Sequence, residues 1–561
     1  NHQSGHAFKA MEAYERWFER KGEMGQRQLA VLRLLGLFDR PAPKNCLDAL
    51  QDAPVIAGLT EHLVGLGPRD WNIVTTRLKE IDLLIVQADG SLDAHPLLRE
   101  YFSQRLRRTQ HGAWQTAHRR LYEHLSATTR EGSLPTLEDI QPLYQAVAHG
   151  CLAGLRQEVY AQVFLIRILR KMELYSCKKL GAMGSDLGAV ACFFETPWSR
   201  LLPGLTEIDQ IKLLNSAAYY LQALGRQSEA LEPMRAALND CINRRVWELA
   251  VFCAGNTSEL ELTLGMVSEA LKDAEKAVSY AGLSDGPDWW GIRALVIFAD
   301  ALHQAGHRAA AEESFIKAER RLAEVLHRFP LLHSMNGFRY CDLLLTKAER
   351  TAWQILSSRG DSPSGPLHDA KISSDLQSCA SVFQRATQTL KWAEKENVSS
   401  LDIALDKLTR TRATLYAEVL SSSSSSDFNI ATSYAELAVT GLRHANQQQC
   451  LPLGLLTRAW LRCLTGTRTG PESAQSDLDE AWEIAKRGPM PLLLADIHLY
   501  RARLFGGQKD VGGKSTYPWE SAQADLSEAR SLIEKHGYWR RKEELNDAET
   551  AFNLRRGQDT A

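Results

Sequence analysis

Residues 511–516 of this chain have the sequence VGGKST, in which Gly and Lys residues resemble a phosphate-binding loop. Such a loop joins a strand to a helix, and its backbone N–H groups and Lys hold the phosphates. The pattern also requires a Gly six residues before the Lys, but position 508 is Gln. The flanking stretches have helical periodicity, so we interpret this segment as a loop between two helices.

No other pattern in the sequence indicates an enzyme. There is no G-x-S-x-G, no H-E-x-x-H, and no G-x-G-x-x-G after a predicted strand. The ten cysteines form no C-x-x-C pair, and no His spacing completes a zinc site. The sequence therefore predicts no catalytic residues, no metal and no cofactor in this chain.

His95 is the single residue with the most chemical interest, because of where it lies. Two short β-like runs surround the Asp89-Gly90 pair, which predicts a hairpin. Helical patterns precede this hairpin, and the stretch HPLLREYFSQRLR returns to helix directly after it. We expect a linker helix over 1–27, a winged-helix domain over 28–108 and a helical connector over 109–205.

A repeat begins near residue 211. The segments GRQSEALEPMRAAL, GMVSEALKDAEKAV and GHRAAAEESFIKAE begin at Gly225, Gly265 and Gly306, which are 40 or 41 residues apart. Gly allows a turn between paired helices, small Ala residues allow close approach, and the larger residues fill the space between hairpins. Such units stack into a superhelix. The predicted fold class is therefore mostly α, with a small winged helix followed by an α-solenoid of TPR-like hairpins over 206–561. Three positions keep this register, namely Ala230, Ala270 and Ala311; then Met234, Ala274 and Phe315; then Ala237, Ala277 and Ala318.

The composition of the chain limits the classes of partner that we expect it to bind. Lys plus Arg total 66 against 68 for Asp plus Glu, so the chain lacks the basic character of a nucleic-acid-binding protein. No apolar run approaches the roughly 18 residues of a membrane span, and there is no signal-peptide pattern. Scattered cysteines in apolar stretches are typical of a reducing cytoplasm. Because the chain opens with Asn1, we interpret it as part of a longer or processed protein.

Residues 6–108 resemble the winged-helix region of STAND signalling ATPases, the class that includes NLR-like, NACHT and NB-ARC proteins. The resemblance rests on HAFKAMEAYERWF, LAVLRLLGLFDRP and LDAHPLLREYF. In that class, a Met-His-Asp motif followed by an apolar pair ends the winged helix. Its His contacts the phosphate of the bound nucleotide and favours the resting ADP state. Ala94-His95-Pro96-Leu97-Leu98 occupies that place, so only His95 is carried over.

Residues 110–555 resemble the TPR-like sensor of bacterial STAND proteins. The resemblance implies that the P-loop NTPase and effector domains are absent, and that ADP or ATP belongs to the parent protein. It also implies a protein or peptide ligand on the concave face, which acts as a trigger in microbial antiviral defence. Counting inward positions along the first and third hairpins gives the ligand-binding candidates Lys212, Asn215, Tyr219, Gln222, Arg293, Asp300 and His303.

Other functions stay open at this stage. A TPR scaffold that joins proteins, with no nucleotide-linked switch, predicts that His95 is silent. A STAND-type transcription regulator would need basic residues on the helix over 70–83. That stretch carries Arg77 and Lys79 against Asp70, Glu80 and Asp82, which is too little positive charge to follow a phosphate backbone. A hydrolase rests on no feature of the sequence.

Overall fold

The computed structural model describes residues 2–357, 366–396, 399–421, 428–506 and 516–560. Most of the VGGKST segment therefore lies outside the described residues. As predicted, the described chain is mostly α-helical, with four very short strands. It divides into two compact units. Unit 1 comprises residues 1–175, 191–195 and 202–206, and unit 2 comprises 176–190, 196–201 and 207–561.

Unit 1 begins with a bundle in which the first helix packs against α2 and α5. The buried carboxylate of Glu15, on this first helix, accepts a hydrogen bond from the Tyr101 hydroxyl at 2.9 Å and pairs with Arg33 at 3.2 Å. These contacts fix the first helix on the bundle. The elements are α1 (His2–Glu19), α2 (Gly22–Leu35), α3 (Lys44–Gln51), α4 (Pro68–Glu80), β1 (Ile85–Val86), β2 (Leu92–Asp93) and α5 (Pro96–Thr109).

The predicted hairpin at Asp89-Gly90 is present. Strands β1 and β2 pair antiparallel, Gly90 takes a positive φ of 82°, and Ala42 adds an isolated bridge to Leu92. The stretch 58–66 forms consecutive turns rather than a helix. Gly58 and Gly65 both have positive φ, of 85° and 82°, which is incompatible with a continuous right-handed helix.

The rest of unit 1 is a second group of helices, α6 (His111–Thr128), α7 (Leu137–Leu152), α8 (Arg156–Glu158), the π-helix η1 (Val159–Ile168) and the 3-10 turn η2 (Lys171–Glu173). The connection to the array contains α9 (Tyr175–Lys178), α10 (Met183–Ala191), β3 (Phe194–Thr196) and β4 (Arg200–Leu201). Helix α6 packs against both α3 and α7, and thereby joins the two groups of helices in unit 1.

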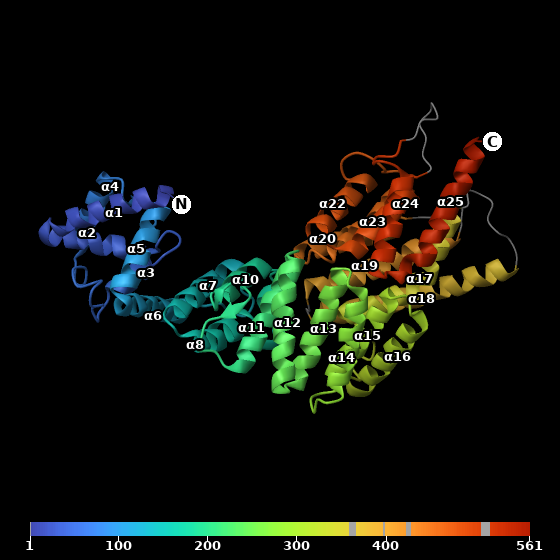
Figure 1. Cartoon of the computed structure of the whole chain (residues 1–561), viewed down its shortest axis with the longest axis horizontal. Coiled ribbons are helices and arrows are strands. Elements are labelled where there is room, and N and C mark those ends of the chain that lie inside the picture. The colour runs from blue at the N-terminus through green and yellow to red at the C-terminus, as the bar shows by residue number, and fades with distance from the viewer. Residues whose placement is uncertain (1, 358–365, 397–398, 422–427, 507–515, 561) are drawn as a thin grey trace. The chain divides into compact units, whose positions relative to one another are not determined.

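The described residues of unit 2 from Glu207 onward form an array of seven helical hairpins. Consecutive helices of this array pack side by side (Figure 1). The hairpins are α11 (Glu207–Ala223) with α12 (Gln227–Arg244), α13 (Trp247–Thr263) with α14 (Val267–Ala281), α15 (Trp289–Gln304) with α16 (Arg308–Val325), α17 (Ser334–Ser357) with α18 (Pro366–Lys395), α19 (Ser400–Ser421) with α20 (Asn429–His444), α21 (Leu451–Leu464) with α22 (Ala474–Arg487), and α23 (Pro491–Phe505) with α24 (Ala522–His536). The turn η3 (Trp539–Arg541) and α25 (Lys542–Thr560) follow.

The repeat register predicted from the sequence is confirmed. All nine Ala, Met and Phe residues of that register are fully buried. Gly225, Gly265 and Gly306 lie in the turns between paired helices, with positive φ of 79°, 74° and 81°. Small residues therefore let paired helices approach, as the pattern requires.

The array winds back on itself, so its last hairpins contact its first. A Cβ added to Gly265 would lie 2.5 Å from Cγ of Pro491, and one added to Gly306 would lie 2.8 Å from Cβ of Trp539. Near the first hairpin, the N–H of Gln448 donates to the carbonyl of Ala223 at 2.9 Å. Helices α13, α15 and α17 contact α23, η3 and α25 respectively. The inner helices thus meet partners about five hairpins further along the chain.

Candidate ligand-binding surface

The first helices of the early hairpins share an inner face, which we call the inner wall. It consists of the inward side chains of α11, α13, α15 and α17. Asn256 donates from Nδ2 to Oδ1 of Asn215 at 3.0 Å, and Arg293 donates from Nη2 to Oδ1 of Asn256 at 2.6 Å. Each bond joins neighbouring hairpins. Two of the predicted candidates, Asn215 and Arg293, are therefore linked through a third residue on the same wall.

The next links in this wall are ionic. Arg339 donates to Glu259 at 2.6 Å and its Nε lies 3.1 Å from Oδ2 of Asp300, while Glu259 also pairs with Arg293 at 3.5 Å. Burial by itself raises the pKa of Glu259, but Arg339 and Arg293 outweigh that effect and lower it. Glu259 therefore stays ionised and holds α15 and α17 against α13.

Asp342 is the meeting point of four elements. Its Oδ1 accepts hydrogen bonds from Arg412 of α19 at 2.8 Å and from Arg540 of η3 at 3.0 Å. His303 of α15 lies 3.6 Å from Oδ2. Burial raises the pKa of Asp342, yet Arg540 and Arg412 hold it well below its usual range. Burial, followed by the charge of Arg540, lowers the pKa of His303, so this predicted candidate stays neutral at pH 7.

Glu349, two turns further along α17, is completely buried and has a similar role. Arg412 donates to its Oε2 at 3.3 Å, and Nη1 of Arg541 lies 3.4 Å from its Oε1. Arg541 also donates to Asp496 at 2.8 Å and to Glu544 at 2.6 Å. We call the cluster around Asp342 and Glu349 the central ion network. It joins the fourth and fifth hairpins to the end of the array.

The remaining candidates on the array have more local surroundings. The Tyr219 hydroxyl accepts a hydrogen bond from Nε2 of Gln447 at 2.8 Å, which links α11 to the segment before α21. Gln222 is buried, and its carbonyl accepts from Nε2 of Gln227 at 2.9 Å. Lys212 is half exposed, with Nζ 3.6 Å from Oδ1 of Asp209. Among the candidates on the array, Lys212 is thus the one most open to solvent.

His95 lies in unit 1 as the N-cap residue of α5, with an exposed side chain. Its Nδ1 accepts a hydrogen bond from the N–H of Leu97 at 3.3 Å. Pro96 follows at the first helical position, where the missing N–H is no loss. The geometry therefore gives His95 a local role as the cap that starts α5. Its other ring nitrogen, Nε2, takes no part in this hydrogen bond.

Apart from His303, which lies beside Asp342, the residues of the central ion network were not predicted from the sequence. The available signal was a charge inside an apolar run, because Asp342 interrupts the sequence CDLLL and Arg540-Arg541 follow a Gly-Tyr-Trp turn. A buried charge requires a partner of opposite sign. The pattern indicates that a partner exists but not which residue it is.

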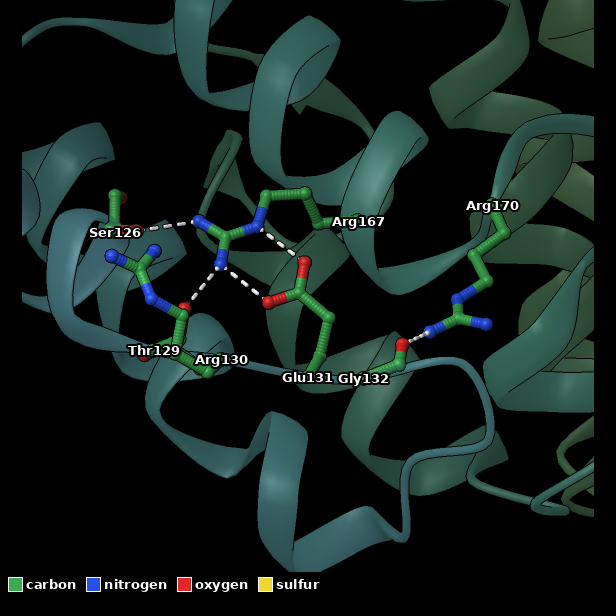
Figure 2. A pocket seen from close by; sticks show the side chains of 7 residues that line it. All are labelled: Ser126, Thr129, Arg130, Glu131, Gly132, Arg167 and Arg170. Atoms are coloured by element: carbon green, nitrogen blue, oxygen red, sulfur yellow. Dashed lines mark hydrogen bonds and ion pairs between the residues drawn. The ribbon is translucent and has the colours of Figure 1, made fainter.

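A separate hollow of about 630 Å³ lies in unit 1, lined by Arg130, Arg167, Arg170 and residues of the loop after α6 (Figure 2). Arg167 forms a two-bonded pair with Glu131, at 2.6 Å for each bond, and donates to the carbonyl of Ser126 at 2.6 Å. Arg170 donates to the carbonyl of Gly132 at 2.8 Å. These guanidinium groups hold the loop onto η1, so we interpret the hollow as a by-product of loop anchoring.

Within the described residues, no group of three or more His, Cys, Asp or Glu side chains is placed to hold a metal ion. In the same part of the chain, no helix combines the length and the apolar character that a membrane span requires.

No protein-family model and no curated protein sequence matches the chain. Among solved structures, the chain is similar to a STAND protein (Signal Transduction ATPase with Numerous Domains) with a tetratricopeptide repeat sensor, from Pyrococcus horikoshii. That match has 11% identity and a TM-score of 0.36, and covers 96% of this chain and 67% of the other. It is also similar to a Rap protein complexed with competence and sporulation factor, at 11% identity and a TM-score of 0.28, covering 82% of this chain and 95% of the other.

Proposed function

We propose that this chain is the ligand-sensing and autoinhibitory half of a STAND-type signalling protein, without enzymatic activity of its own. In this proposal the helical array binds a protein or peptide trigger. The inner wall, with its neighbouring Lys212, supplies the polar groups for recognition, and the P-loop NTPase that binds ADP or ATP belongs to the parent protein.

The observation that carries the proposal is the central ion network. Replacing a buried ion pair by apolar residues of similar size is often neutral or stabilising, so such a network is a poor device for stability alone. A network that joins early and late hairpins has a second use. A ligand that replaces some of these pairs changes how the ends of the array are held together, which is what a two-state switch requires.

The test uses the full chain as bait in lysate from cells of its own organism. We expect one partner that saturates at a fixed stoichiometry and is lost when Lys212, Tyr219 and Arg293 are all replaced by Ala. A matched control replaces Glu313, Glu324 and Glu528, which are exposed, by Gln. Circular dichroism of both variants establishes that they are folded. A partner that binds both variants equally, or the lack of any saturable partner, would contradict a sensor that uses its inner wall.

A scaffold without nucleotide-linked switching is the second candidate, and the capping role of His95 favours it. The two candidates differ in what happens to His95→Asn, which retains a capping side chain. If the NTPase-containing parent loses its preference for ADP in this variant, the switch is supported. If nucleotide affinity is unchanged, the scaffold is supported.

A further inference from the structure

The first residues of α15, together with the turn that precedes them, carry an unusual group of aromatic side chains. Trp289 and Trp290 stack with ring centroids 3.9 Å apart, and Phe252 of α13 meets the edge of Trp290 at 5.7 Å. Trp289 is 40% exposed, and Leu283 in the same turn is 56% exposed. The stacked pair, with Trp289 exposed and Trp290 half-buried, presents an apolar face to water.

Exposed tryptophans elsewhere in the described chain are covered by cations of the chain itself. Nζ of Lys21 lies 3.4 Å from the centroid of Trp17, and Nζ of Lys542 lies 5.5 Å from that of Trp539. Trp17 and Trp539 are 41% and 43% exposed, much like Trp289. In the part of the chain that the structure describes, no lysine or arginine lies over Trp289 or Trp290.

Acidic residues lie in and beside the turn that precedes Trp289. Asp285 and Asp288 belong to the turn itself, and Oε1 of Glu248 from α13 lies 2.6 Å from where a Cβ on Gly286 would be. Among the described residues, none of the three carboxylates has an ion-pair partner within the chain. We call Trp289, Trp290 and these three carboxylates the aromatic–acidic patch.

Three arginines lie near the patch but, within the described chain, form no ion pair with its carboxylates. Arg293 of α15 lies over the Phe252 ring, with Cζ 4.9 Å from the centroid, and pairs with Glu259 of the inner wall instead. Nη1 of Arg321 is 3.4 Å from a Cβ position on Gly291, which is two residues beyond Trp289 and so on the other side of α15. Arg245 precedes Trp247 in the turn before α13 and, among the described residues, forms no ion pair with the three carboxylates. The patch therefore keeps an unbalanced negative charge beside an exposed ring face.

We propose that the aromatic–acidic patch binds an Arg- or Lys-containing segment of a protein partner. A cation over a tryptophan face is attracted by the ring quadrupole, and guanidinium groups also stack on the ring. The carboxylates add long-range attraction for the same charge. The proposal rests on the proposed ligand-sensing function and adds a place and a chemical class for the ligand.

The test is calorimetric titration of the full chain with a capped octapeptide of alternating Gly and Arg. Peptides of alternating Gly and Glu, and of alternating Gly and Ser, serve as charge controls. We expect saturable binding of the Arg peptide at 50 mM salt, weakened at 500 mM because screening shortens the reach of the carboxylates. Trp289→Ala should weaken it about fivefold. The triple variant Glu248→Gln, Asp285→Asn, Asp288→Asn should weaken it about tenfold.

Trp17→Ala is the matched control, because it removes a tryptophan of equal exposure whose face is already covered. The triple neutralisation of Glu313, Glu324 and Glu528 is the matched charge control. Equal weakening by either control, or unchanged affinity in Trp289→Ala, overturns the proposal. Such a failure leaves the sensor function intact if the lysate partner still depends on the inner wall. If binding of the lysate partner does not depend on the inner wall, the proposed sensor function is contradicted, whatever the result with the Arg peptide.

Discussion

We call the contacts between the two helices of a hairpin the seams. The seams and the inner wall of the array are stabilised by different kinds of interaction. The seams use small and bulky apolar residues in one repeated register, such as Ala270, Ala274 and Phe315, all fully buried. The inner wall uses charges, and its central carboxylate, Asp342, is bound by Arg412 and Arg540. Local packing therefore builds each hairpin, whereas distant hairpins are connected by long-range ion pairs together with a few apolar contacts, such as the stack of Trp353 on Trp460 at 3.6 Å between ring centroids.

The largest effect is expected when the central carboxylate is removed. Asp342→Ala leaves Arg412 and Arg540 without this partner in a buried site, and breaking a buried pair in this way costs about 3–5 kcal/mol. Urea unfolding of the full chain, followed by fluorescence, measures the loss. A loss below about 1 kcal/mol, typical of exposed ion pairs, would show that the inner wall is not held by its charges.

A buried carboxylate without a cationic hydrogen-bond partner sharpens the same contrast. Asp406 of α19 accepts a hydrogen bond from the Thr389 hydroxyl at 2.8 Å, but its Oδ2 is buried without a hydrogen-bond partner. Burial raises the pKa of Asp406 to about 7. The folded state thus holds a proton that the unfolded state releases, so stability present below pH 4 is lost as the pH rises through 7.

The substitution Asp406→Asn should remove this loss of stability at high pH, because the amide side chain does not ionise. We expect the variant to be more stable than the original chain at pH 8 by about 2–4 kcal/mol. The gain should shrink steadily as the pH is lowered towards 4. Thermal unfolding across this range measures it, and a gain that does not depend on pH would contradict the raised pKa.

The seams should respond to added volume where they meet the end of the array. Gly265→Ala introduces a Cβ that meets Pro491 and His536, at a residue with φ of 74°. Gly466→Ala is the matched control, because Gly466 has φ of 91° and nothing within 4 Å of the added Cβ. Both should lose about 1–2 kcal/mol to backbone strain. Gly265→Ala should lose about 1–3 kcal/mol more through overpacking. Equal losses of stability in the two variants would mean that Pro491 and His536 move away from the added Cβ at little cost.

The smallest loss of stability is expected for an exposed ion pair outside the central ion network. Glu543 is 72% exposed at its side chain and pairs with Arg350, which also binds Asp547 at 2.6 Å. Glu543→Ala should cost less than about 1 kcal/mol, because solvent screens exposed pairs and a second carboxylate remains. Denaturant unfolding in parallel with Asp342→Ala gives the comparison. A loss as large as that of Asp342→Ala would show that burial does not decide which pairs matter.

What the sequence predicts well is what depends on nearby residues. The repeat from Gly225 to Gly306 predicts the hairpins because helix pairing is decided within about 40 residues. The hairpin at Asp89-Gly90 follows from local turn chemistry in the same way.

The inner wall was only partly predictable. Counting along the helices places Asn215, Arg293 and Asp300 inward, and the structure connects them in one ladder. Their partners are remote, since Arg540 and Asp342 are 198 residues apart. The winding of the whole array decides such pairs, and no local pattern encodes it. The aromatic–acidic patch could not be predicted from the sequence either. It depends on which tryptophan faces are left without a lysine or arginine over them in the folded chain.

The most direct test of the account is hydrogen–deuterium exchange of the full chain carrying Arg540→Ala, compared with the original chain. We expect faster exchange in α15 and α17 as well as in η3, because the long-range pairs connect them. The outer helices α12, α14 and α16 should keep their protection, since their seams are untouched. Faster exchange confined to the neighbourhood of η3 would contradict the claim that the inner wall joins the two ends of the array.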